Sequence, residues 1–210
     1  MAVPTLQNFA STLREKNIAR PNLYYVTIVT PNSMAGTSTE LASMWCSAAH
    51  TPHTTISTND NYIEAGVRRK YAYDVDYQNL VLNFYVDQDF EIKKFFDTWK
   101  QKVTPYNRQF NYPDSYTADK LSLYILNQEN NVTYEYEYSR VFPKTISSME
   151  LSYSSGNSIA GFTVEFVFED VYFKYSKDGS TSKPITEVIQ EKQNTLNNEV
   201  TANLNPKSRN

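Results

Sequence analysis

Two histidines and a cysteine are the residues of this chain best suited to binding a metal or attacking a substrate. His50 and His53 are three residues apart, a spacing that can place two side chains on one face of a helix. Pro52 lies between them, however, and no nearby cysteine or carboxylate completes a zinc shell. Cys46 follows Trp45 in an apolar segment, which is typical of a buried packing cysteine. The sequence therefore predicts neither a metal site nor a thiol nucleophile.

The paired acids Asp87 and Asp89 have the spacing of candidate hydrolase carboxylates. They precede an amphipathic segment, however, and short carboxylate side chains are preferred where a helix begins. The chain also contains no GxSxG, HExxH, P-loop or GxGxxG pattern. We expect neither an enzyme nor a bound cofactor.

Composition favours a β-rich structural protein. The 210 residues include 17 tyrosines, 11 phenylalanines and only 5 glycines, which favours strands with aromatic cross-strand pairs. A net charge of -3 gives no electrostatic reason for tight nucleic-acid binding, and a single cysteine cannot form an internal disulfide. The first 20 residues lack an unbroken apolar core, and no stretch approaches 18 apolar residues. We expect a soluble protein that is not exported and does not bind membranes directly.

Strict alternation marks the segment Val132 to Arg140. Tyrosines occupy one face of this predicted strand and two glutamates the other, because successive side chains of a strand point to opposite faces. The predicted strand that ends at Phe173 is apolar on one face and partly apolar on the second. A single chain has difficulty covering both faces, so we expect a partner chain.

The first half of the chain predicts one helix and several extended segments, separated by polar turns. The segments are a helix over Leu6–Lys16, strands over Leu23–Val29 and Leu41–Ala49, a loop over His50–Asn61, and an extended run over Tyr62–Tyr77 that turns back at Asp76–Asn79 into a strand beginning at Leu80.

A second helix is predicted from about Asp87 to Val103, where Pro105 follows. Its large apolar residues recur at spacings of three and four, so they form one stripe that can seal a sheet. The predicted core residues of this helix are Ile92, Phe95, Phe96 and Trp99.

The second half predicts four strands and then a change of character. The predicted strands are Leu121–Leu126, Val132–Arg140, Ile146–Tyr153 and Ile159–Phe173. Residues 176–184 are small and polar, and Ile185–Leu204 carries a thin helical apolar stripe among Asn, Gln and Glu, for which a disordered tail is the simplest alternative. We therefore expect a β domain over residues 1–175 and a C-terminal extension over residues 176–210.

Several segments, in this order and spacing, resemble the tail tube proteins of contractile-tailed, T-even-like bacteriophages. They are IARPNLYYVTI (Ile18–Ile28), WCSAAHTP (Trp45–Pro52), RKYAYDVDYQNLVLNFYVDQD (Arg69–Asp89), the helix with Phe96 and Trp99, and VFPKTISSMELSYSSGNSIAGFTVEFVFEDVYF (Val141–Phe173). The resemblance covers most of the chain but ends near Phe173, so it assigns no role to the last 35 or so residues.

The resemblance implies a mainly β fold: an antiparallel sandwich or small barrel with one flanking helix, whose strands join those of neighbouring copies into a ring-wide barrel. It also implies hexameric rings that stack into a tube through which DNA leaves the capsid without specific binding. The implied partners are further copies of the chain, the tail sheath, the tape measure and the baseplate. The implied location is the virion tail, assembled in the cytoplasm of the bacterial host.

A channel that passes DNA without holding it should be neutral to acidic, because basic walls bind the phosphate backbone. The candidates for lumen-facing carboxylates are Glu135, Glu137, Asp74 and Asp76, although each could equally be an ordinary solvent-facing strand residue. The candidates for contacts between subunits or rings are Arg68, Arg69, Lys70, His50 and His53, with a solvated charge cluster as the alternative for the basic run. The polar stretches Asn32–Glu40 and His50–Asn61 occupy the place of the loop that reaches the adjacent ring in the family.

Two alternative functions stay open. A baseplate ring that initiates the tube shares the implied fold, and the extra C-terminal segment suits a specialised ring. A carbohydrate- or peptide-binding β-sandwich is the alternative from another class, with Tyr62, Tyr71, Tyr73 and Tyr77 as a stacking platform.

Overall fold

The structure is a computed structural model that describes residues 6–16, 18–31, 34, 40–62, 68–105, 109–149, 151–153, 159–175, 184–192 and 194. The chain divides into two compact units, each assembled from separate stretches of sequence. Unit 1 combines Met1–Tyr25, Leu123–Tyr136 and Phe173–Asn210, and unit 2 combines Val26–Ser122 and Glu137–Tyr172. The division at residue 175 that the composition suggests stays a prediction. No helix among the described residues is long and apolar enough to cross a membrane.

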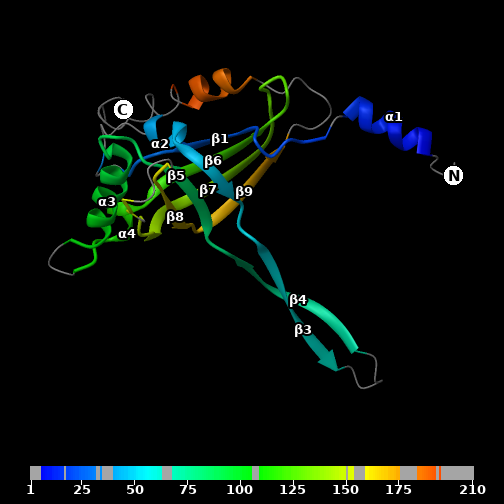
Figure 1. Ribbon diagram of the computed structural model, residues 1–210. Helices are drawn as coiled ribbons and strands as arrows, with labels where there is room; N and C mark the ends of the chain where they lie inside the picture. The colour runs from blue at the N-terminus through cyan, green and yellow to red at the C-terminus, as the bar shows by residue number, and fades with distance from the viewer. Residues whose placement is uncertain are drawn as a thin grey trace, which may run out of the picture. The chain divides into compact units, whose positions relative to one another are not determined.

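Strands dominate the chain, as Figure 1 shows. The elements are, in order, α1 (Leu6–Lys16), β1 (Tyr24–Ile28), α2 (Glu40–Met44), β2 (Cys46–His50), β3 (Thr54–Tyr62), β4 (Arg68–Tyr77), β5 (Leu80–Tyr85), α3 (Glu91–Val103), α4 (Pro113–Tyr116), β6 (Ala118–Leu126), β7 (Val132–Ile146), β8 (Gly161–Val167) and β9 (Asp170–Tyr175). Residues 185–192 form a further helix.

Seven strands form one sheet in the order β1-β6-β7-β8-β5-β2, and β9 pairs with β7 beside this path. The pairs β2–β5, β5–β8 and β7–β8 are antiparallel. Strands β3 and β4 form a separate antiparallel pair. This arrangement confirms the predicted fold class, which is mainly β and antiparallel.

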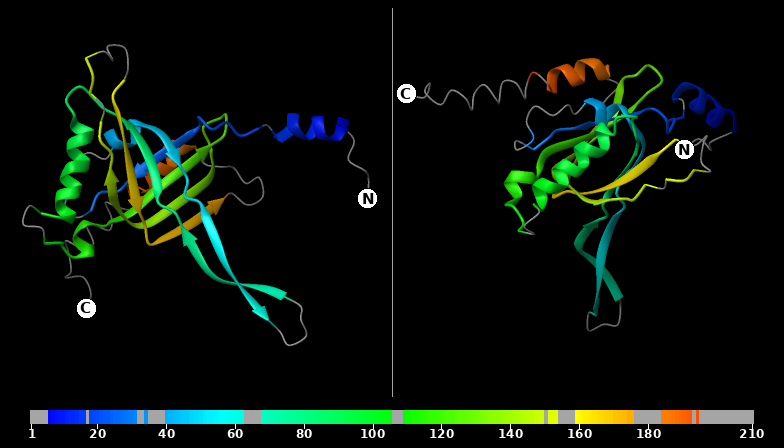
Figure 2. Two further views of the ribbon diagram at one scale, coloured as in Figure 1. Left: turned by 60° about the horizontal axis from the view of Figure 1, so that its bottom comes forward. Right: turned by 60° about the vertical axis from the view of Figure 1, so that its left-hand side comes forward.

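Helix α3 supplies the largest side chains of the core in unit 2, and Figure 2 shows it beside the sheet. Its predicted stripe is buried, with Trp99 and Phe96 at 0% exposure. The Phe96 ring contacts Phe84 of β5 at 4.9 Å and Phe166 of β8 at 6.0 Å between centroids. These contacts fix the helix on the sheet because each buried aromatic side chain stabilises the fold by about 1.5–3 kcal/mol. The other two predicted core residues, Ile92 and Phe95, are also buried.

The predicted cap of α3 is present. The Asp87 carboxylate accepts hydrogen bonds from the backbone amides of Glu91 at 2.9 Å and Ile92 at 3.3 Å. Burial of Asp87 opposes ionisation, but the bonds from these two amides favour the carboxylate and lower its pKa. Phe90 joins the cap to the helix in the left-handed region, at φ 56°.

Three predictions about the strands of the first half are wrong. The stretch His50–Asn61 is largely strand β3, because the strand β4 supplies a backbone partner that its polar composition does not reveal. The predicted strand Leu41–Ala49 is split between α2 and β2. The turn at Asp76–Asn79 does not make a hairpin, since β4 pairs with β3 while β5 pairs with β8 and β2.

Strand β7 is longer than predicted and changes its partner along its length. It continues through Pro143, where we expected a turn, to Ile146, so the predicted strand Ile146–Tyr153 is wrong. Arg140 adopts the left-handed region at φ 49°. Before it, the Ser139 carbonyl accepts a hydrogen bond from the Glu169 amide, next to β9. Beyond it, Phe142 is in register with Val167 of β8, and the register shifts between Pro143 and Thr145. The unusual backbone at Arg140 therefore marks a corner, as expected for a bulge.

Both ends of the described chain are helical. Helix α1 confirms the prediction for Leu6–Lys16, but its apolar stripe is exposed: Leu6 is 87% and Phe9 62% accessible. The helix over residues 185–192 matches the start of the predicted C-terminal stripe. The rest of that stripe, and most of Asn32–Glu40, lie outside the described residues.

Candidate assembly surfaces

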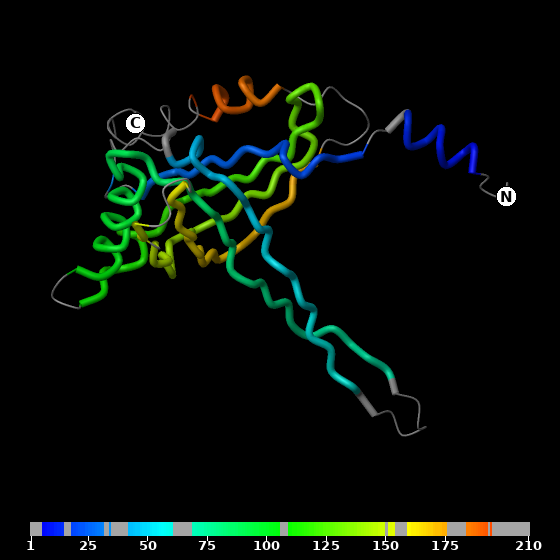
Figure 3. Tube along the Cα trace, in the orientation of Figure 1, coloured from blue at the N-terminus to red at the C-terminus, as the bar shows by residue number. Residues whose placement is uncertain are grey.

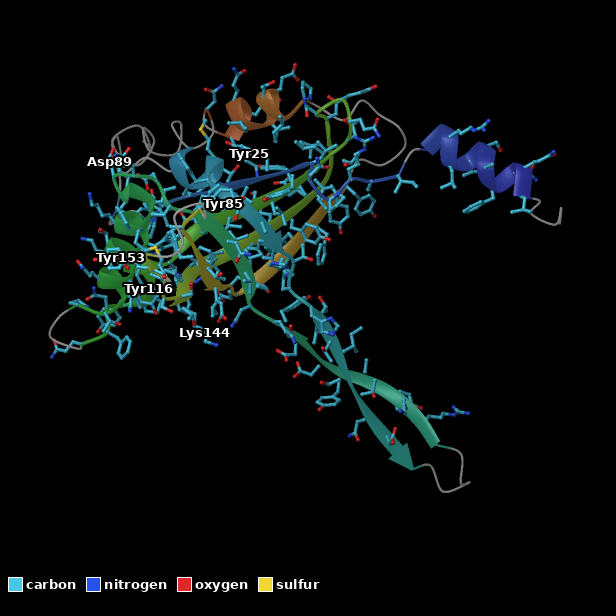
Figure 4. All side chains as sticks on the ribbon, in the orientation of Figure 1. Tyr25, Tyr85, Asp89, Tyr116, Lys144 and Tyr153 are labelled. Atoms are coloured by element: carbon cyan, nitrogen blue, oxygen red, sulfur yellow. The ribbon has the colours of Figure 1, made fainter. Side chains whose placement is uncertain are left out.

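The pair β3–β4 forms a two-stranded ribbon in unit 2, and Figure 3 follows it away from β2 and β5. The register runs from Thr54 opposite Tyr77 to Tyr62 opposite Arg68. Figure 4 shows side chains projecting on both sides of this ribbon. Isolated two-stranded ribbons are marginally stable in water, so an exposed one calls for a partner surface.

The ribbon carries an uncovered apolar surface. Ile56 is 58% exposed and lies opposite Val75, which is 47% exposed. Tyr73, two residues before Val75 in β4 and beside an irregularity in the register, is 70% exposed. Neighbouring exposed apolar residues are the signature of a binding surface, whereas single ones are ordinary.

Four charged residues that the sequence singled out as candidate contact or lumen residues lie on this ribbon, and the structure describes their side chains. Arg69 and Lys70 lie opposite Asn61 and Asp60 near its far end. Asp74 and Asp76 lie nearer its base and are also exposed. Arg68 pairs with Tyr62 in the backbone register, but its side chain lies outside the described residues. The ribbon is therefore weakly basic towards its tip, where the Asp60 carboxylate offsets one of the two positive charges, and acidic towards its base.

The two predicted histidines flank the start of the ribbon. His50 ends β2, and the carbonyl of His53 accepts a hydrogen bond from the Gln78 amide at 3.0 Å just before β3. Both side chains are exposed. Within the part of the chain that the structure describes, no three His, Cys, Asp or Glu residues gather as a metal site would require.

Glu135 and Glu137 lie on strand β7, whereas Asp74 and Asp76 lie on strand β4. The Glu135 carboxylate accepts a hydrogen bond from Lys192 at 2.5 Å, and its side chain is only 12% exposed. The Glu137 carboxylate lies 3.9 Å from the Lys120 ammonium and is 11% exposed. Both carboxylates thus have lysine partners in their own chain, and their lumen role stays a prediction.

Sequence reasoning missed Lys192 as the partner of Glu135. Burial of Lys192 opposes its charge, but hydrogen bonds to Glu135 and Tyr124 outweigh this and raise its pKa. Its ammonium also lies 5.0 Å from the centre of the Tyr124 ring. The two partners are 57 residues apart, so no local pattern could have paired them.

Sequence reasoning also missed a clamp at the corner of β7. The Arg140 guanidinium bonds Asp114 of α4 at 3.0 Å and Glu169, between β8 and β9, at 2.7 Å. The signal would have been a lone arginine at the end of an alternating run, which is too weak to recognise alone.

The seven-stranded sheet has open edges among the described strands. Strands β1, β2 and β9 each pair with one neighbour, respectively β6, β5 and β7. An unpaired edge presents a row of amides and carbonyls that another chain can bind. The ribbon and these edges are therefore candidate surfaces for assembly.

The phage tail tube protein family matches residues 19–174, which is most of the chain. This chain belongs to that family. The match confirms the resemblance stated from sequence. As a member of this family, the tail tube protein is a structural component of a phage tail. Helix α1 and the C-terminal helix lie outside the matched residues.

Solved structures agree with the tail tube fold. One is a chain of the sheath–tube complex of the PVC extracellular contractile injection system in its extended state, at 12% identity and TM-score 0.58, covering 83% of this chain and 100% of that chain. A second comes from the baseplate of the anti-feeding prophage, 6-fold symmetrised, at 14% identity and TM-score 0.57, covering 77% and 99%. A third comes from the tube-terminating cap of the anti-feeding prophage, at 14% identity and TM-score 0.57, covering 84% and 95%. At these identities the likeness shows the fold. No curated protein sequence matches the chain.

Proposed function

We propose that this tail tube protein forms the inner tube of a contractile phage tail by closing into rings of six copies that stack on one another. The observation that carries the proposal is the β3–β4 ribbon, whose exposed apolar face and basic tip suit contact with a second copy. The 6-fold symmetry named for the baseplate relative supports six copies per ring. In such a ring the open edges of β1, β2 and β9 can pair with a neighbour, which removes exposed sheet edges.

The proposed tube is a conduit for DNA. A net charge of -3 and the pairing of Glu135 and Glu137 with lysines leave little excess positive charge to hold a phosphate backbone. Asp74 and Asp76 remain candidates for the wall where the ribbon base approaches the channel. Repulsion is screened within about 8 Å at physiological salt, so only carboxylates at the wall act on the duplex.

The proposed partners are the sheath outside the tube, the tape measure inside it, and the baseplate at its end. The relatives drawn from sheath–tube and baseplate structures support the sheath and the baseplate as partners, whereas the tape measure is proposed from the family resemblance alone. We propose assembly in the host cytoplasm and incorporation into the virion tail.

A baseplate ring that initiates the tube is the second candidate, and the similarity to a baseplate chain favours it. Negative-stain images of the purified full chain separate the two functions. Long tubes support the tube protein, and single rings support the initiator. A chain that stays monomeric at high concentration in sedimentation, and retains a ligand on a glycan array, would overturn both.

Charge reversal on the ribbon tests how rings stack. We expect Arg69→Glu with Lys70→Glu to leave rings intact but to abolish long tubes, because the tip would repel an acidic partner surface. The matched control is Lys100→Glu with Lys144→Glu, which changes the net charge equally at exposed positions outside the ribbon. Tubes of parental length from the ribbon variant would show that its tip makes no contact between rings.

A further inference from the structure

The C-terminal helix over residues 185–192 lies against strands β6 and β7 of unit 1. Pro184 makes an antiparallel bridge with Asn131, and the Ile185 amide donates to the Asn130 carbonyl at 3.2 Å, so the helix starts at the turn between these strands. Its aliphatic residues are half-buried, and the polar residues between them are exposed. The half-buried aliphatic residues are Ile185, Val188 and Ile189, and the exposed residues are Thr186, Glu187, Gln190 and Glu191.

The surface beneath the end of this helix has the chemistry of a receptor for a cation. Glu135 on β7 supplies a carboxylate 2.5 Å from the Lys192 ammonium. Tyr124 on the neighbouring strand β6 supplies a ring whose centre is 5.0 Å from the same ammonium, and its side chain is fully buried. A carboxylate and an aromatic face together bind an ammonium more strongly than either alone. Removing Lys192 would leave Glu135 a largely desolvated carboxylate that has lost this cation.

The helix is an addition to the fold. The family match ends at residue 174, and eight residues, 176–183, join β9 to the bridge at Pro184. No described residue of the segment 184–192 is fully buried. The backbone bridge, the Ile185–Asn130 hydrogen bond and the contacts of Lys192 with Glu135 and Tyr124 join it to unit 1, and its three aliphatic side chains are half-buried. A segment in which no described residue is fully buried can leave the surface while the buried core of α3, β5 and β8 in unit 2 stays closed.

We propose that the Tyr124–Glu135 surface is a docking site for a short amphipathic helix that carries a lysine, and that residues 184–192 are its exchangeable occupant. A helix that binds this site has three aliphatic residues at helical spacing and a lysine one turn further along, as Ile185, Val188, Ile189 and Lys192 do in the resident segment. Because the segment belongs to the same chain as the site, its binding is intramolecular, so an outside helix binds only weakly until the resident helix is loosened. The site is thus kept covered in the free chain. The proposal does not depend on ring stacking.

Peptide binding to the full-length chain tests the proposal. The probe is a fluorescent synthetic peptide of residues 184–194, and the readout is its anisotropy. We expect the Lys192→Glu chain to bind this peptide at least tenfold more tightly than the unchanged chain, because the introduced carboxylate repels Glu135 and opens the site. Lys100→Glu is the matched control and should behave as the unchanged chain, since Lys100 is exposed on α3.

A charge swap makes the test specific to the pair. In the chain with both Glu135→Lys and Lys192→Glu the ion pair is restored with reversed charges, so this chain should bind the peptide more weakly than the Lys192→Glu chain does. A peptide carrying the Lys192→Glu change should not bind the single-variant chain. Equal peptide affinities for the unchanged and Lys192→Glu chains, or no binding to the latter, would overturn the proposal.

Two further measurements keep the outcome decisive. Far-UV circular dichroism establishes that each variant is folded. If Lys192→Glu fails to fold, a protease site placed within residues 178–183 of the unchanged chain allows the cut segment to exchange with the labelled peptide. Exchange supports the docking site, and a cut segment that never exchanges overturns it. Negative-stain images of the same samples record tube formation separately, so failure of the docking site and failure of the proposed function are distinguishable.

Discussion

Replacing Trp99 with alanine is the most direct test of how the core is held. The Trp99 side chain is 0% exposed, packs against Phe95 and Phe166 with ring centres 5.8 and 6.1 Å away, and donates a hydrogen bond from Nε1 to the Tyr116 carbonyl at 2.7 Å. Removing a buried tryptophan leaves a cavity and costs about 3–5 kcal/mol. A typical domain has only about 5–15 kcal/mol in total, so we expect the variant to lose a large fraction of its stability.

A second substitution separates packing from hydrogen bonding. Trp99→Phe keeps most of the ring contacts but leaves the Tyr116 carbonyl, in α4 and labelled in Figure 4, without its donor. We expect a loss of about 1–3 kcal/mol, which is the cost of one unsatisfied buried polar group. Phe110→Ala is the control, because Phe110 is 78% exposed and its removal should change stability by less than about 0.5 kcal/mol.

The assay is urea unfolding followed by far-UV circular dichroism, since tryptophan fluorescence changes with the substitution itself. Protein concentration must be kept low enough that all variants are monomeric, because assembly raises apparent stability. The reasoning is refuted if Trp99→Ala costs less than about 1 kcal/mol, or if the phenylalanine and alanine variants lose the same stability.

Two further predictions concern the cap and the corner. Asp87→Ala should destabilise the chain by about 1 kcal/mol at pH 7, whereas the control Asp89→Ala should have little effect, as thermal melting will show. Because the folded pKa of Asp87 lies below its ordinary value, the stabilisation is present above about pH 4 and is lost as the pH falls through the folded pKa. The difference between the Asp87→Ala variant and the parent should therefore shrink as the pH falls below about 4, and a difference that stays constant through this range contradicts this account. At the corner, Arg140→Gly should be less destabilising than Arg140→Ala, because both lose the clamp but only glycine adopts φ 49° without strain; the opposite order in urea unfolding would show that the backbone there is not strained.

The sequence predicts α3 and its cap well because their signals are local. The stripe that includes Phe96 and Trp99 recurs at helical spacing, and an aspartate precedes it. Strand β7 is recognisable for the same reason, since Tyr134 and Tyr136 alternate with glutamates and their rings meet at 4.8 Å on one face.

The second strand of the ribbon lies within the predicted extended run Tyr62–Tyr77, but its first strand could not be predicted because its residues are mostly polar and exposed. Thr54 to Tyr62 has the Thr, Ser and Asn content of a loop, and only pairing with β4 makes it a strand. The end of β7 was missed because Pro143 favours a turn. In the structure Pro143 lies beside a shift of register between β7 and β8. At such a position the amide donor that proline lacks disturbs the cross-strand hydrogen bonds least.

The sequence pointed to residues of the candidate surfaces only where a run of charges stood out at one place in the chain. Arg69, Lys70, Asp74 and Asp76 stand out in the sequence, and all four lie on the ribbon. The partner of Glu135 depends on a fold that returns residue 192 to β7, so it could not be read from spacing.

The ribbon has a consequence for how related tubes can diverge. Side chains of a strand alternate between faces, so one residue added to each strand before Ile56 and after Val75 would turn this pair to the opposite side. Two residues added to each strand would keep the pair on its present face and lengthen the ribbon by about 6.6 Å. Natural length variation in this ribbon should therefore come in multiples of two residues per strand, which sets discrete steps for its reach.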